Sequence, residues 1–479
     1  MDIIKKQKNK SIQISFIDEY ASENVTGSMV YIKTPNHKLL LDAGFVQSND
    51  IETDYKRNTR SMKKFKIKEI DYLFLTHTHG DHIFLAPYLY KQGCTAKTMI
   101  PKDSINILKI MLENCAGINE RDARYLTKRN KKRFNPIFDN DDIEYFLKYV
   151  EEYPIGYMIK IDEELSFKWI PSGHLLKGCQ LELYITIGNH TKKILYTSDL
   201  GNPKLRQCFT ESFEPIEKAN YVIAESTYGD KSDLKIRKKE RELEMKYLKE
   251  LILSQVVDKQ GKLLIPSFSQ SRTQSISYLI YEIFKNQDIK FDIYIDSPLS
   301  MKLFDAMKDI LTDGELLKLK ELLKWKHLKF ISSIEESFAL MKSQKPCIII
   351  SSSGMCNHGR VKEHLKYILP NFNASILFIG YAGEGTTADK IQKNKIVEID
   401  KQSYEINCNV YTLKTMSSHM PFKELVEYYS SIHCEKIFLH HGSKIATKTL
   451  KETLEKKFIE DCKTTAVVAV NHDTIFEIS

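Results

Sequence analysis

Four potential metal ligands lie close together in the segment His77-Thr78-His79-Gly80-Asp81-His82. The segment follows the apolar run Tyr72–Leu75, which predicts that the ligands occupy a loop leaving a strand. Imidazole nitrogens and carboxylate oxygens suit Zn²⁺ and similar divalent cations. Packing gives no reason to gather such side chains, because buried polar groups without partners are costly. The segment therefore predicts a metal site.

Further candidate ligands follow predicted strands elsewhere in the chain. Two metal ions about 3.5–4 Å apart would need roughly seven protein ligands, and the loop supplies four. His174, Asp199 and His441 each lie where a predicted strand stops, which is where active-site residues commonly gather. Taken alone, each could equally be a cap or a surface residue. Asp42, in the turn Leu41–Gly44, suits a supporting role that orients the imidazoles of the loop.

The elements that must position these residues change character along the chain. Near the N-terminus, Ser11–Phe16, Met29–Thr34 and His37–Asp42 are short, β-rich and separated by turn signals, so they predict strands. From residue 262 to about 395, strands alternate with helices, as in a parallel sheet. After residue 410 the first pattern returns. The alternating block is therefore predicted to be an insertion into a first domain that the C-terminal segment completes.

Composition sets broad limits on the function. The 479 residues carry 71 Lys and Arg against 63 Asp and Glu, with 42% hydrophobic residues, which is ordinary for globular domains and excludes wholesale disorder. No apolar stretch approaches the roughly 18 residues that a membrane span needs. The N-terminus lacks the apolar region of a secretory signal. Nine dispersed cysteines argue for reduced thiols, so a cytoplasmic protein without membrane association is expected.

Taken in order, these motifs resemble the signature of the metallo-β-lactamase fold, and others resemble its β-CASP branch of nucleases. The motifs that resemble the branch are Glu225–Gly229, Ile265–Phe268 with Arg272–Gln274, Asp296–Leu299, Ser352–Met355 with Gly359-Arg360, Ser418-His419 and His441-Gly442. The resemblance implies an α/β fold, an αββα sandwich formed by residues 1–228 and 415–479. It also implies a β-CASP domain inserted at residues 229–414, with a largely parallel sheet flanked by helices.

The resemblance further implies a metal-dependent ribonuclease, because a histidine at position 441 is similar to the RNA-processing members of the branch. These include the 3′-end-cleaving endonuclease of mRNA maturation and its prokaryotic homologues. The expected reaction is hydrolysis of phosphodiester bonds in single-stranded RNA by a hydroxide shared between two zinc ions, with manganese as the alternative metal. Endonucleolytic cleavage is favoured, and 5′-exonucleolytic cleavage stays open.

The same resemblance assigns roles to individual residues. His77, His79 and His174 would hold one zinc ion, Asp81, His82 and His441 the other, and Asp199 would bridge them. Asp81 and Asp199 are thereby also expected to be catalytic. His419 is the expected general acid and Glu225 the carboxylate that holds it. Glu225 could instead cap a helix, and His419 could merely adjoin an N-cap.

Substrate contacts are predicted in two places. Arg272, Ser353 and Arg360, in motifs of the inserted domain, would either contact phosphates or brace that domain. Two basic stretches, Lys56–Lys68 with Phe65 and Arg124–Arg133 with Tyr125, would either follow the RNA backbone or form a solvated face. A homodimer through the inserted domain is expected by analogy with relatives.

The sequence departs from the family pattern at several positions. Ser271 stands where a glycine is usual, Pro421 where an acidic residue is usual, Ser443 where a glutamate is usual, and Lys177-Gly178 where Gly-Ser is usual. None of these departures removes a candidate ligand. Two other functions stay open: a hydrolase of a small ester or thioester, and a non-catalytic RNA-binding scaffold. The first leaves the inserted block unexplained, and members of the second class typically lose metal ligands.

Overall fold

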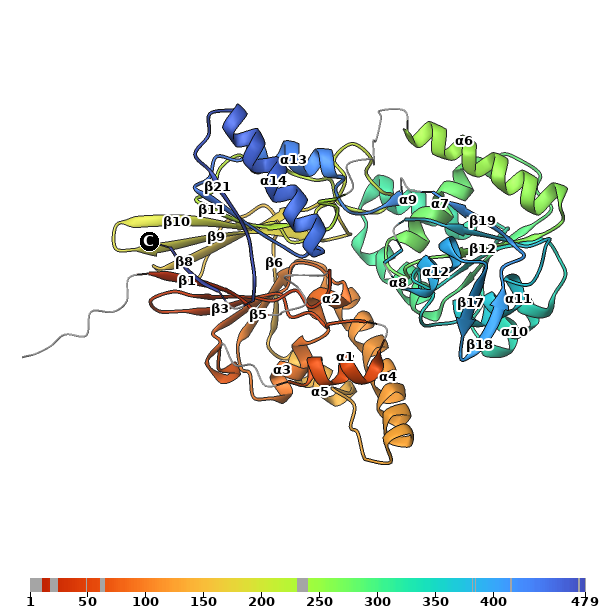
Figure 1. Ribbon diagram of the computed structural model, residues 1–479, viewed down its shortest axis with the longest axis horizontal. Coiled ribbons are helices and arrows are strands. Elements are labelled where there is room, and N and C mark those ends of the chain that lie inside the picture. The colour runs from red at the N-terminus through yellow and green to blue at the C-terminus, as the bar shows by residue number, and fades with distance from the viewer. Residues whose placement is uncertain are drawn as a thin grey trace, which may run out of the picture. The chain divides into compact units, whose positions relative to one another are not determined.

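The computed structural model describes residues 11–17, 25–48, 50–60, 65–230, 240–380, 382–383, 385–413, 416–472 and 474–478. The chain divides into two compact units, each of which is described here by itself (Figure 1). The first unit comprises Met1–Pro203, Glu211–Lys235 and His419–Ser479, and the second comprises Lys204–Thr210 and Ile236–Ser418.

These divisions differ from the boundaries predicted at 228/229 and 414/415. Lys204–Thr210 belongs to the second unit because it packs on a helix of that unit, α7 (Arg272–Phe284). The Ser275 hydroxyl donates to the carbonyl oxygen of Cys208 at 3.0 Å. The rings of Phe209 and Tyr278 lie 5.4 Å apart between centroids. Such packing of a short, distant segment leaves no pattern in the local sequence.

The first unit is built on two seven-stranded sheets. In order across the first sheet, the strands are β22 (Ile475–Ile478), β1 (Ile12–Phe16), β2 (Val30–Lys33), β3 (Lys38–Leu41), β4 (Tyr72–Phe74), β5 (Lys97–Pro101) and β6 (Val150–Tyr153). Across the second sheet they are β21 (Ala466–Ala469), β20 (Lys436–His440), β11 (Tyr221–Glu225), β10 (His190–Tyr196), β9 (Cys179–Ile187), β8 (Leu165–Pro171) and β7 (Ile159–Lys160).

The two sheets bury one apolar core between them. Alternating strand residues fill it, among them Ile14 and Phe74 from the first sheet and Trp169 and Leu183 from the second. Helices cover the outer faces (Figure 1). On the first sheet's side these are α1 (Ile51–Asn58), the 3₁₀ turn η1 (Ile67–Glu69), α2 (Gly80–Ile83), α3 (Ala86–Lys91), α4 (Ile105–Asn130) and α5 (Asn140–Leu147). On the second sheet's side, α13 (Phe422–Ser431) and α14 (Lys444–Glu460) pack through Leu425 and Leu450. The predicted αββα sandwich is confirmed.

The second unit contains a six-stranded, all-parallel sheet. In order the strands are β14 (Leu328–Phe330), β13 (Asp292–Asp296), β15 (Cys347–Ser351), β12 (Lys262–Pro266), β16 (Ser375–Phe378) and β19 (Asn409–Thr412). A separate antiparallel pair joins β17 (Ile396–Ile399) to β18 (Gln402–Glu405). Strands β12 and β15 are buried along their whole length, as expected when helices cover both faces of a parallel sheet. The prediction of a largely parallel sheet is confirmed.

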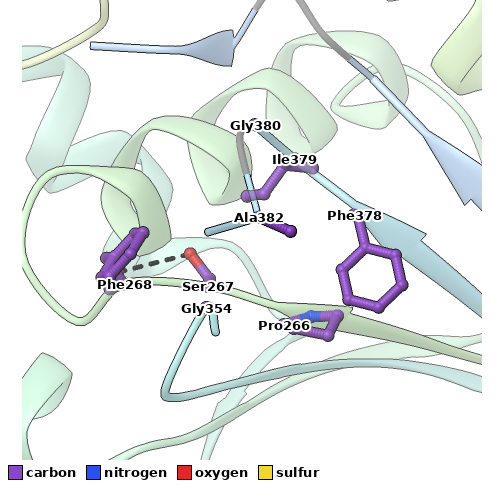
Figure 2. A pocket seen from close by; sticks show the side chains of 8 residues that line it. All are labelled: Pro266, Ser267, Phe268, Gly354, Phe378, Ile379, Gly380 and Ala382. Carbon is purple, nitrogen blue, oxygen red and sulfur yellow. Dashed lines mark hydrogen bonds between the residues drawn. The ribbon is translucent and has the colours of Figure 1, made fainter. Parts of the chain in front are cut away.

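The helices of the second unit follow its strands in alternation. They are α6 (Glu240–Ile252) with the π-turn η2 (Leu253–Asp258), α7, α8 (Pro298–Ile310), α9 (Asp313–Lys324), α10 (Ile334–Lys342), α11 (Val361–Ile368) and α12 (Thr387–Lys393). A small pocket lies at the carboxyl ends of β12 and β16, where Pro266, Ser267, Phe268, Gly354, Phe378, Ile379, Gly380 and Ala382 line it (Figure 2). Among the helices that the structure describes, none is both long and apolar enough to cross a membrane.

Candidate metal centre

The loop after β4 is held in place by the neighbouring turn at Asp42–Phe45. The amide of Ala43 donates to the carbonyl oxygen of His82 at 2.7 Å, and the amide of Phe45 donates to that of Gly80 at 3.1 Å. A Cβ atom on Gly44 would lie 1.6 Å from the carbonyl oxygen of Asp81. Only glycine therefore permits this close approach of the two segments, which sets the direction of the side chains on α2.

Three other candidate ligands come from strand ends of the second sheet. His174 follows β8, Asp199 follows β10 and His441 follows β20, while His77 arrives from β4 of the first sheet. The metal loop of one sheet thus meets three chain segments that leave the other. His441 adopts φ +54°, which turns its side chain directly at the end of its strand.

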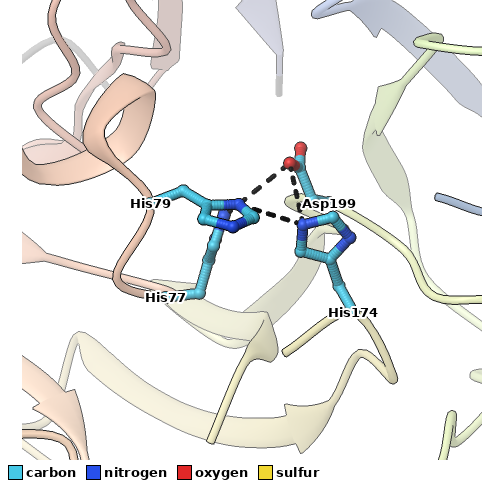
Figure 3. Close-up of side chains that lie close together, drawn as sticks. All are labelled: His77, His79, His174 and Asp199. Carbon is cyan, nitrogen blue, oxygen red and sulfur yellow. Dashed lines mark hydrogen bonds and ion pairs between the residues drawn. The ribbon is translucent and has the colours of Figure 1, made fainter. Parts of the chain in front are cut away.

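The seven candidate ligands form two groups that share Asp199. Ligand atoms of His77, His79, His174 and Asp199 all lie within 4.8 Å of one another (Figure 3), and so do those of Asp81, His82, Asp199 and His441. Oδ2 of Asp199 is 3.5 Å from Nε2 of His174 and 3.7 Å from Nε2 of His77. Oδ1 of Asp199 is 3.4 Å from Nε2 of His82 and 3.2 Å from Nδ1 of His441. Each carboxylate oxygen therefore faces one group.

The donor atoms fit divalent cations better than a hydrogen-bond network. Nε2 of His77, Nε2 of His82, Nε2 of His441 and Oδ1 of Asp199 are buried, and in the described part of the chain none has a hydrogen-bond partner. Buried polar atoms without partners are uncommon in native proteins, and a bound ion is one physical reason for them. The set of imidazole and carboxylate donors is one that zinc accepts.

Burial and mutual charge shift the pKa values of these groups in opposite directions. Burial lowers the pKa of His77 well below its ordinary value and that of His79 to about 4, so both imidazoles are neutral. Burial also opposes a proton on His82, but the charges of Asp199 and Asp42 outweigh it and raise the pKa of His82. Burial would raise the pKa of Asp199, yet His441 and His82 hold it well below its usual range. Asp199 is thus an anion placed to meet positive charge.

Asp42, for which the sequence suggested a supporting role, forms hydrogen bonds with residues around the metal loop. Its buried carboxylate accepts hydrogen bonds from the Thr76 amide at 2.8 Å, the Tyr196 hydroxyl at 2.8 Å and Nδ1 of His82 at 2.7 Å. The bond to Nδ1 leaves Nε2 of His82 directed at the second group. Asp42 therefore orients one candidate ligand and closes the turn that carries the others.

Sequence reasoning missed the hydroxyl groups that hold the other imidazoles. Thr76 Oγ1 and Ser198 Oγ each lie 3.2 Å from Nδ1 of His77. Thr227 Oγ1 lies 3.3 Å from Nδ1 of His441. Thr76 and Ser198 each adjoin a candidate ligand in the sequence, and Thr227 lies within the motif Glu225–Gly229, so these positions are the signal that could have found them.

His419 and Glu225 meet at the edge of the first ligand group. Nδ1 of His419 is 3.7 Å from Oε1 of Glu225, and its ring centroid is 4.6 Å from that of His174. Oε1 of Glu225 accepts the Leu200 amide at 3.1 Å, and Oε2 accepts the Thr227 amide at 2.9 Å. Neither amide opens a helix, so Glu225 is not a helix cap. Its carboxylate is fixed beside His419.

The predicted residues of the inserted block lie in the second unit. Nη1 of Arg272 donates to the Ile379 carbonyl oxygen at 2.7 Å, and Nη2 donates to the Ser418 hydroxyl at 3.3 Å. A Cβ atom on Gly380 would lie 2.4 Å from Nη1, so the absence of a side chain there makes room for the guanidinium. Ser353, which adjoins the pocket residue Gly354, is partly exposed, with its hydroxyl 3.4 Å from the His358 carbonyl oxygen.

Arg360 belongs to a buried charge cluster around Asp296. Nη1 of Arg360 donates to Oδ1 of Asp296 at 2.6 Å, and Nη2 donates to the Ser332 carbonyl oxygen at 3.1 Å. Oδ2 of Asp296 lies 2.6 Å from Nε2 of His364 and accepts the Ser337 hydroxyl at 2.5 Å. These contacts join β13, α10 and α11. The geometry favours the bracing alternative for Arg360.

Three of the four departures from the family pattern lie at helix starts, and the fourth, Lys177-Gly178, lies in the turn before β9. Ser271 precedes α7 with φ +66°, a conformation that favours glycine. Pro421 precedes α13 without a side-chain cap. Ser443 caps α14, because its hydroxyl accepts the Ala446 amide at 3.1 Å. The departure at position 443 therefore supplies an N-cap to α14.

Comparison with known proteins places these features in a family. Three family models match the chain: the Metallo-beta-lactamase superfamily over residues 23–146, the Beta-Casp domain over 273–391, and the Zn-dependent metallo-hydrolase RNA specificity domain over 403–465. A similar solved structure is a protein of unknown function from Enterococcus faecalis, with a TM-score of 0.53 and 11% identity, covering 98% of this chain and 100% of that one. At that identity the likeness concerns the fold alone.

Curated relatives match along most of their length. Ribonuclease TTHA0252 of Thermus thermophilus is 25% identical, over 88% of this chain and 92% of its own. The transcription termination factor FttA of Methanocaldococcus jannaschii is 25% identical, over 97% of this chain and 71% of its own. An RNase J-like protein of the same organism is 26% identical, over 90% and 92%. The chain belongs to the RNA-processing β-CASP branch of the metallo-β-lactamase superfamily.

Proposed function

We propose that this chain is a zinc-dependent ribonuclease that cleaves internal phosphodiester bonds of single-stranded RNA. The observation that carries the proposal is the pair of ligand groups that share Asp199, because phosphoryl-transfer sites commonly hold two metal ions a few ångströms apart. The names of the relatives support RNA as the substrate.

The ligand sets follow from the two groups. His77, His79 and His174 would hold one ion, Asp81, His82 and His441 would hold the other, and Asp199 belongs to both groups. The mixture of imidazole and carboxylate favours zinc, with manganese as the alternative. Bound cations supply positive charge at the scissile phosphate and lower the pKa of a water molecule toward neutrality.

The leaving 3′-oxygen needs a proton, and His419 is the donor that we assign. An imidazolium is the side-chain acid best matched to neutral pH. Glu225, fixed by two backbone amides, stabilises that charge and orients the ring from 3.7 Å. The His419 side chain is 20% exposed, so a substrate can reach it.

Two variants separate the metal site from the proton donor. We expect His419→Ala to keep bound zinc and to lose about 10²–10⁴-fold in cleavage rate, the usual worth of a general acid. We expect Asp81→Ala to lose both zinc and activity. His190→Ala, an exposed histidine on β10, is the matched control. Cleavage by His419→Ala at the wild-type rate would remove His419 from the mechanism.

Substrate panels test the proposed activity itself. The holoenzyme is incubated with end-labelled single-stranded RNA, single-stranded DNA and nitrocefin, with and without a chelator. We expect chelator-sensitive cleavage of RNA only, with internal fragments in the product ladder. Release of labelled mononucleotide from the 5′ end would replace endonuclease by 5′-exonuclease action. Hydrolysis of nitrocefin alone, or binding of RNA without cleavage, would refute the proposal.

Pairing of two copies through the second unit stays part of the proposal, by analogy with relatives. Sedimentation equilibrium of the full chain measures it, and a mass of one chain at all concentrations would contradict it.

A further inference from the structure

The structure brings two basic stretches, distant in sequence, onto one surface of the first unit. Helix α1 packs against the C-terminal part of α4 (Figure 1). The Asn130 side-chain amide donates to Oε2 of Glu52 at 3.3 Å, and the rings of Tyr55 and Phe134 lie 5.2 Å apart between centroids. The end of α1 and the end of α4 therefore form one continuous region.

This region is strongly basic. The segments 50–60 and 121–133 together carry ten basic and four acidic residues. We call it the α1–α4 basic surface, and its basic members are Lys56, Arg57, Arg60, Arg121, Arg124, Lys128, Arg129, Lys131, Lys132 and Arg133. All seven members from α4 onward are exposed. The surface therefore presents a concentrated positive charge to solvent.

The basic side chains at the end of α4 interact with acidic neighbours only at longer range, as Arg129 does with Asp50 and Glu52. Within the described ranges, none of the seven basic side chains from Arg121 to Arg133 forms an ion pair within 4.0 Å. Helix α14 shows the ordinary arrangement, with pairs such as Lys448–Glu452 at 3.8 Å and Lys451–Glu455 at 3.6 Å. The helix dipole favours cations only in the last turn, so it does not account for Arg121 and Arg124.

An aromatic side chain lies within the charge. Arg121, Arg124, Tyr125 and Lys128 recur at the spacing that places residues on one face of a helix. The Tyr125 side chain is 47% exposed, so its ring is accessible from solvent. Basic groups with an interleaved aromatic ring are what proteins use to hold single-stranded nucleic acid, because the charges contact phosphates and the ring stacks on a base.

The other predicted stretch contributes less than its composition suggested. Phe65 is buried and stacks on Tyr31 at 5.2 Å, so it cannot receive a base. Lys66 pairs with Glu69 at 3.0 Å. Lys63 and Lys64 lie outside the described residues. From this stretch, Lys56, Arg57 and Arg60 therefore belong to the α1–α4 basic surface.

The surface is tied to the metal loop through the chain between them. The Asn58 side chain, at the end of α1, accepts from the Val46 amide and donates to its carbonyl oxygen, both at 2.8 Å. The adjacent Phe45 amide donates to Gly80 in the metal loop. The end of α1 is therefore linked to the metal loop by hydrogen bonds through Val46 and Phe45.

We propose that the α1–α4 basic surface binds the phosphate backbone of single-stranded RNA away from the scissile bond. This inference rests on the proposed ribonuclease function, because it extends the grip on that substrate. Of the two basic stretches of the first unit, it assigns the RNA backbone contacts to the end of α4 rather than to the Lys66–Lys68 segment.

The test uses a fourfold variant, Arg121→Gln, Arg124→Gln, Lys128→Gln and Lys132→Gln, in the full-length holoenzyme. Its matched control removes four positive charges from α14: Lys444→Gln, Lys448→Gln, Lys451→Gln and Lys456→Gln. Binding of a fluorescent, phosphorothioate-linked single-stranded RNA is followed by anisotropy between about 50 and 200 mM salt. Hydrolysis of bis(p-nitrophenyl) phosphate reports the metal centre without the surface.

We expect the slope of log affinity against log salt to fall by about 2–3 in the α4 variant, since each phosphate contact contributes about 0.7 for single strands. Affinity at low salt should fall about tenfold or more. Hydrolysis of the small phosphodiester should stay at the wild-type rate. Tyr125→Ala should weaken binding about fivefold with an unchanged slope, because stacking carries no charge.

The other outcomes distinguish failure of this inference from failure of the ribonuclease proposal. An unchanged slope in the α4 variant, or an equal change in the α14 control, overturns it and leaves the ribonuclease proposal intact if wild type cleaves RNA. Loss of small-substrate hydrolysis in the α4 variant also overturns it, since the effect would then act through the metal centre. If the α4 variant shows the expected change in slope relative to wild type but the wild-type protein cleaves no RNA, the ribonuclease proposal fails while the RNA-binding surface stands.

Discussion

Substituting Asp42 tests whether the metal centre depends on residues that never touch the metal. The Asp42 carboxylate is fully buried and accepts from the Thr76 amide and hydroxyl, the Tyr196 hydroxyl and Nδ1 of His82. Asparagine keeps one acceptor oxygen and turns an NH₂ group toward donors. Loss of such a partner typically lowers metal affinity about 10–100-fold. For Asp42→Asn we expect that loss, which equals about 1.4–2.7 kcal/mol of binding free energy.

The second unit offers a matched control. Asp296 is also fully buried, lies 2.6 Å from a histidine Nε2 and accepts a serine hydroxyl. Asp296→Asn should lower the melting temperature, because it weakens a buried charge cluster, yet leave zinc affinity at the wild-type value. Competition with a chromophoric chelator measures affinity, and calorimetry measures unfolding. Wild-type zinc affinity in Asp42→Asn, or an equal loss in Asp296→Asn, would refute the reasoning.

Four further perturbations have expected outcomes. Burial raises the pKa of Glu244 to about 7, so near neutral pH the folded state holds a proton that the unfolded state releases. The free energy of unfolding should therefore fall as pH rises from about 4.5 to 7, and at pH 8 Glu244→Gln should be more stable than wild type by about 1–3 kcal/mol. Denaturant titrations at several pH values measure both effects. Ser271→Gly should raise stability by about 1 kcal/mol, because it relieves φ +66°, and an unchanged chemical midpoint would contradict this. Gly44→Ala should abolish zinc binding, because its Cβ would lie 1.6 Å from the Asp81 carbonyl oxygen. Gly314→Ala is the control and should keep zinc, because its Cβ would meet nothing within 4 Å. Metal analysis of both variants measures the difference. Removing the metal with a chelator should lower the unfolding temperature of the first unit. Compared with protein in metal at a hundred times its Kd, the loss of unfolding free energy should be about 2.7 kcal/mol. An unchanged transition in calorimetry would count against a metal bound to the folded state.

Much of the fold could be predicted because its signals are local. The strands β1 to β4 are short, apolar and bounded by turn residues, and the alternating elements of the second unit indicate a parallel sheet. Other strands escaped because their pattern is weak. β6 contains the exposed pair Glu151 and Glu152. β22 lies far from its partner β1, so no local pattern reveals the pairing.

The candidate site also combines residues that the local sequence predicts with contacts that only the fold reveals. The clustered histidines carry a strong signal, whereas the hydroxyl of Ser198 looks like that of an ordinary loop residue until the fold brings it to His77. Arginine in a motif suggested phosphate binding at position 360, but the guanidinium meets a buried carboxylate that only the tertiary structure reveals. Residue type predicts what a side chain can bind, and the fold decides which partner it reaches.

The late position of His441 and β22 in the chain has a consequence for synthesis. The second ligand group stays incomplete until His441 has emerged from the ribosome, and the first sheet lacks its edge strand until Ile478 has been added. Domains generally fold as units during translation, so the contiguous stretch Ile236–Ser418 can fold earlier. A nascent chain therefore cannot assemble both ligand groups before the whole second unit and His441 have been synthesised, so the metal loop is made long before the centre can be completed.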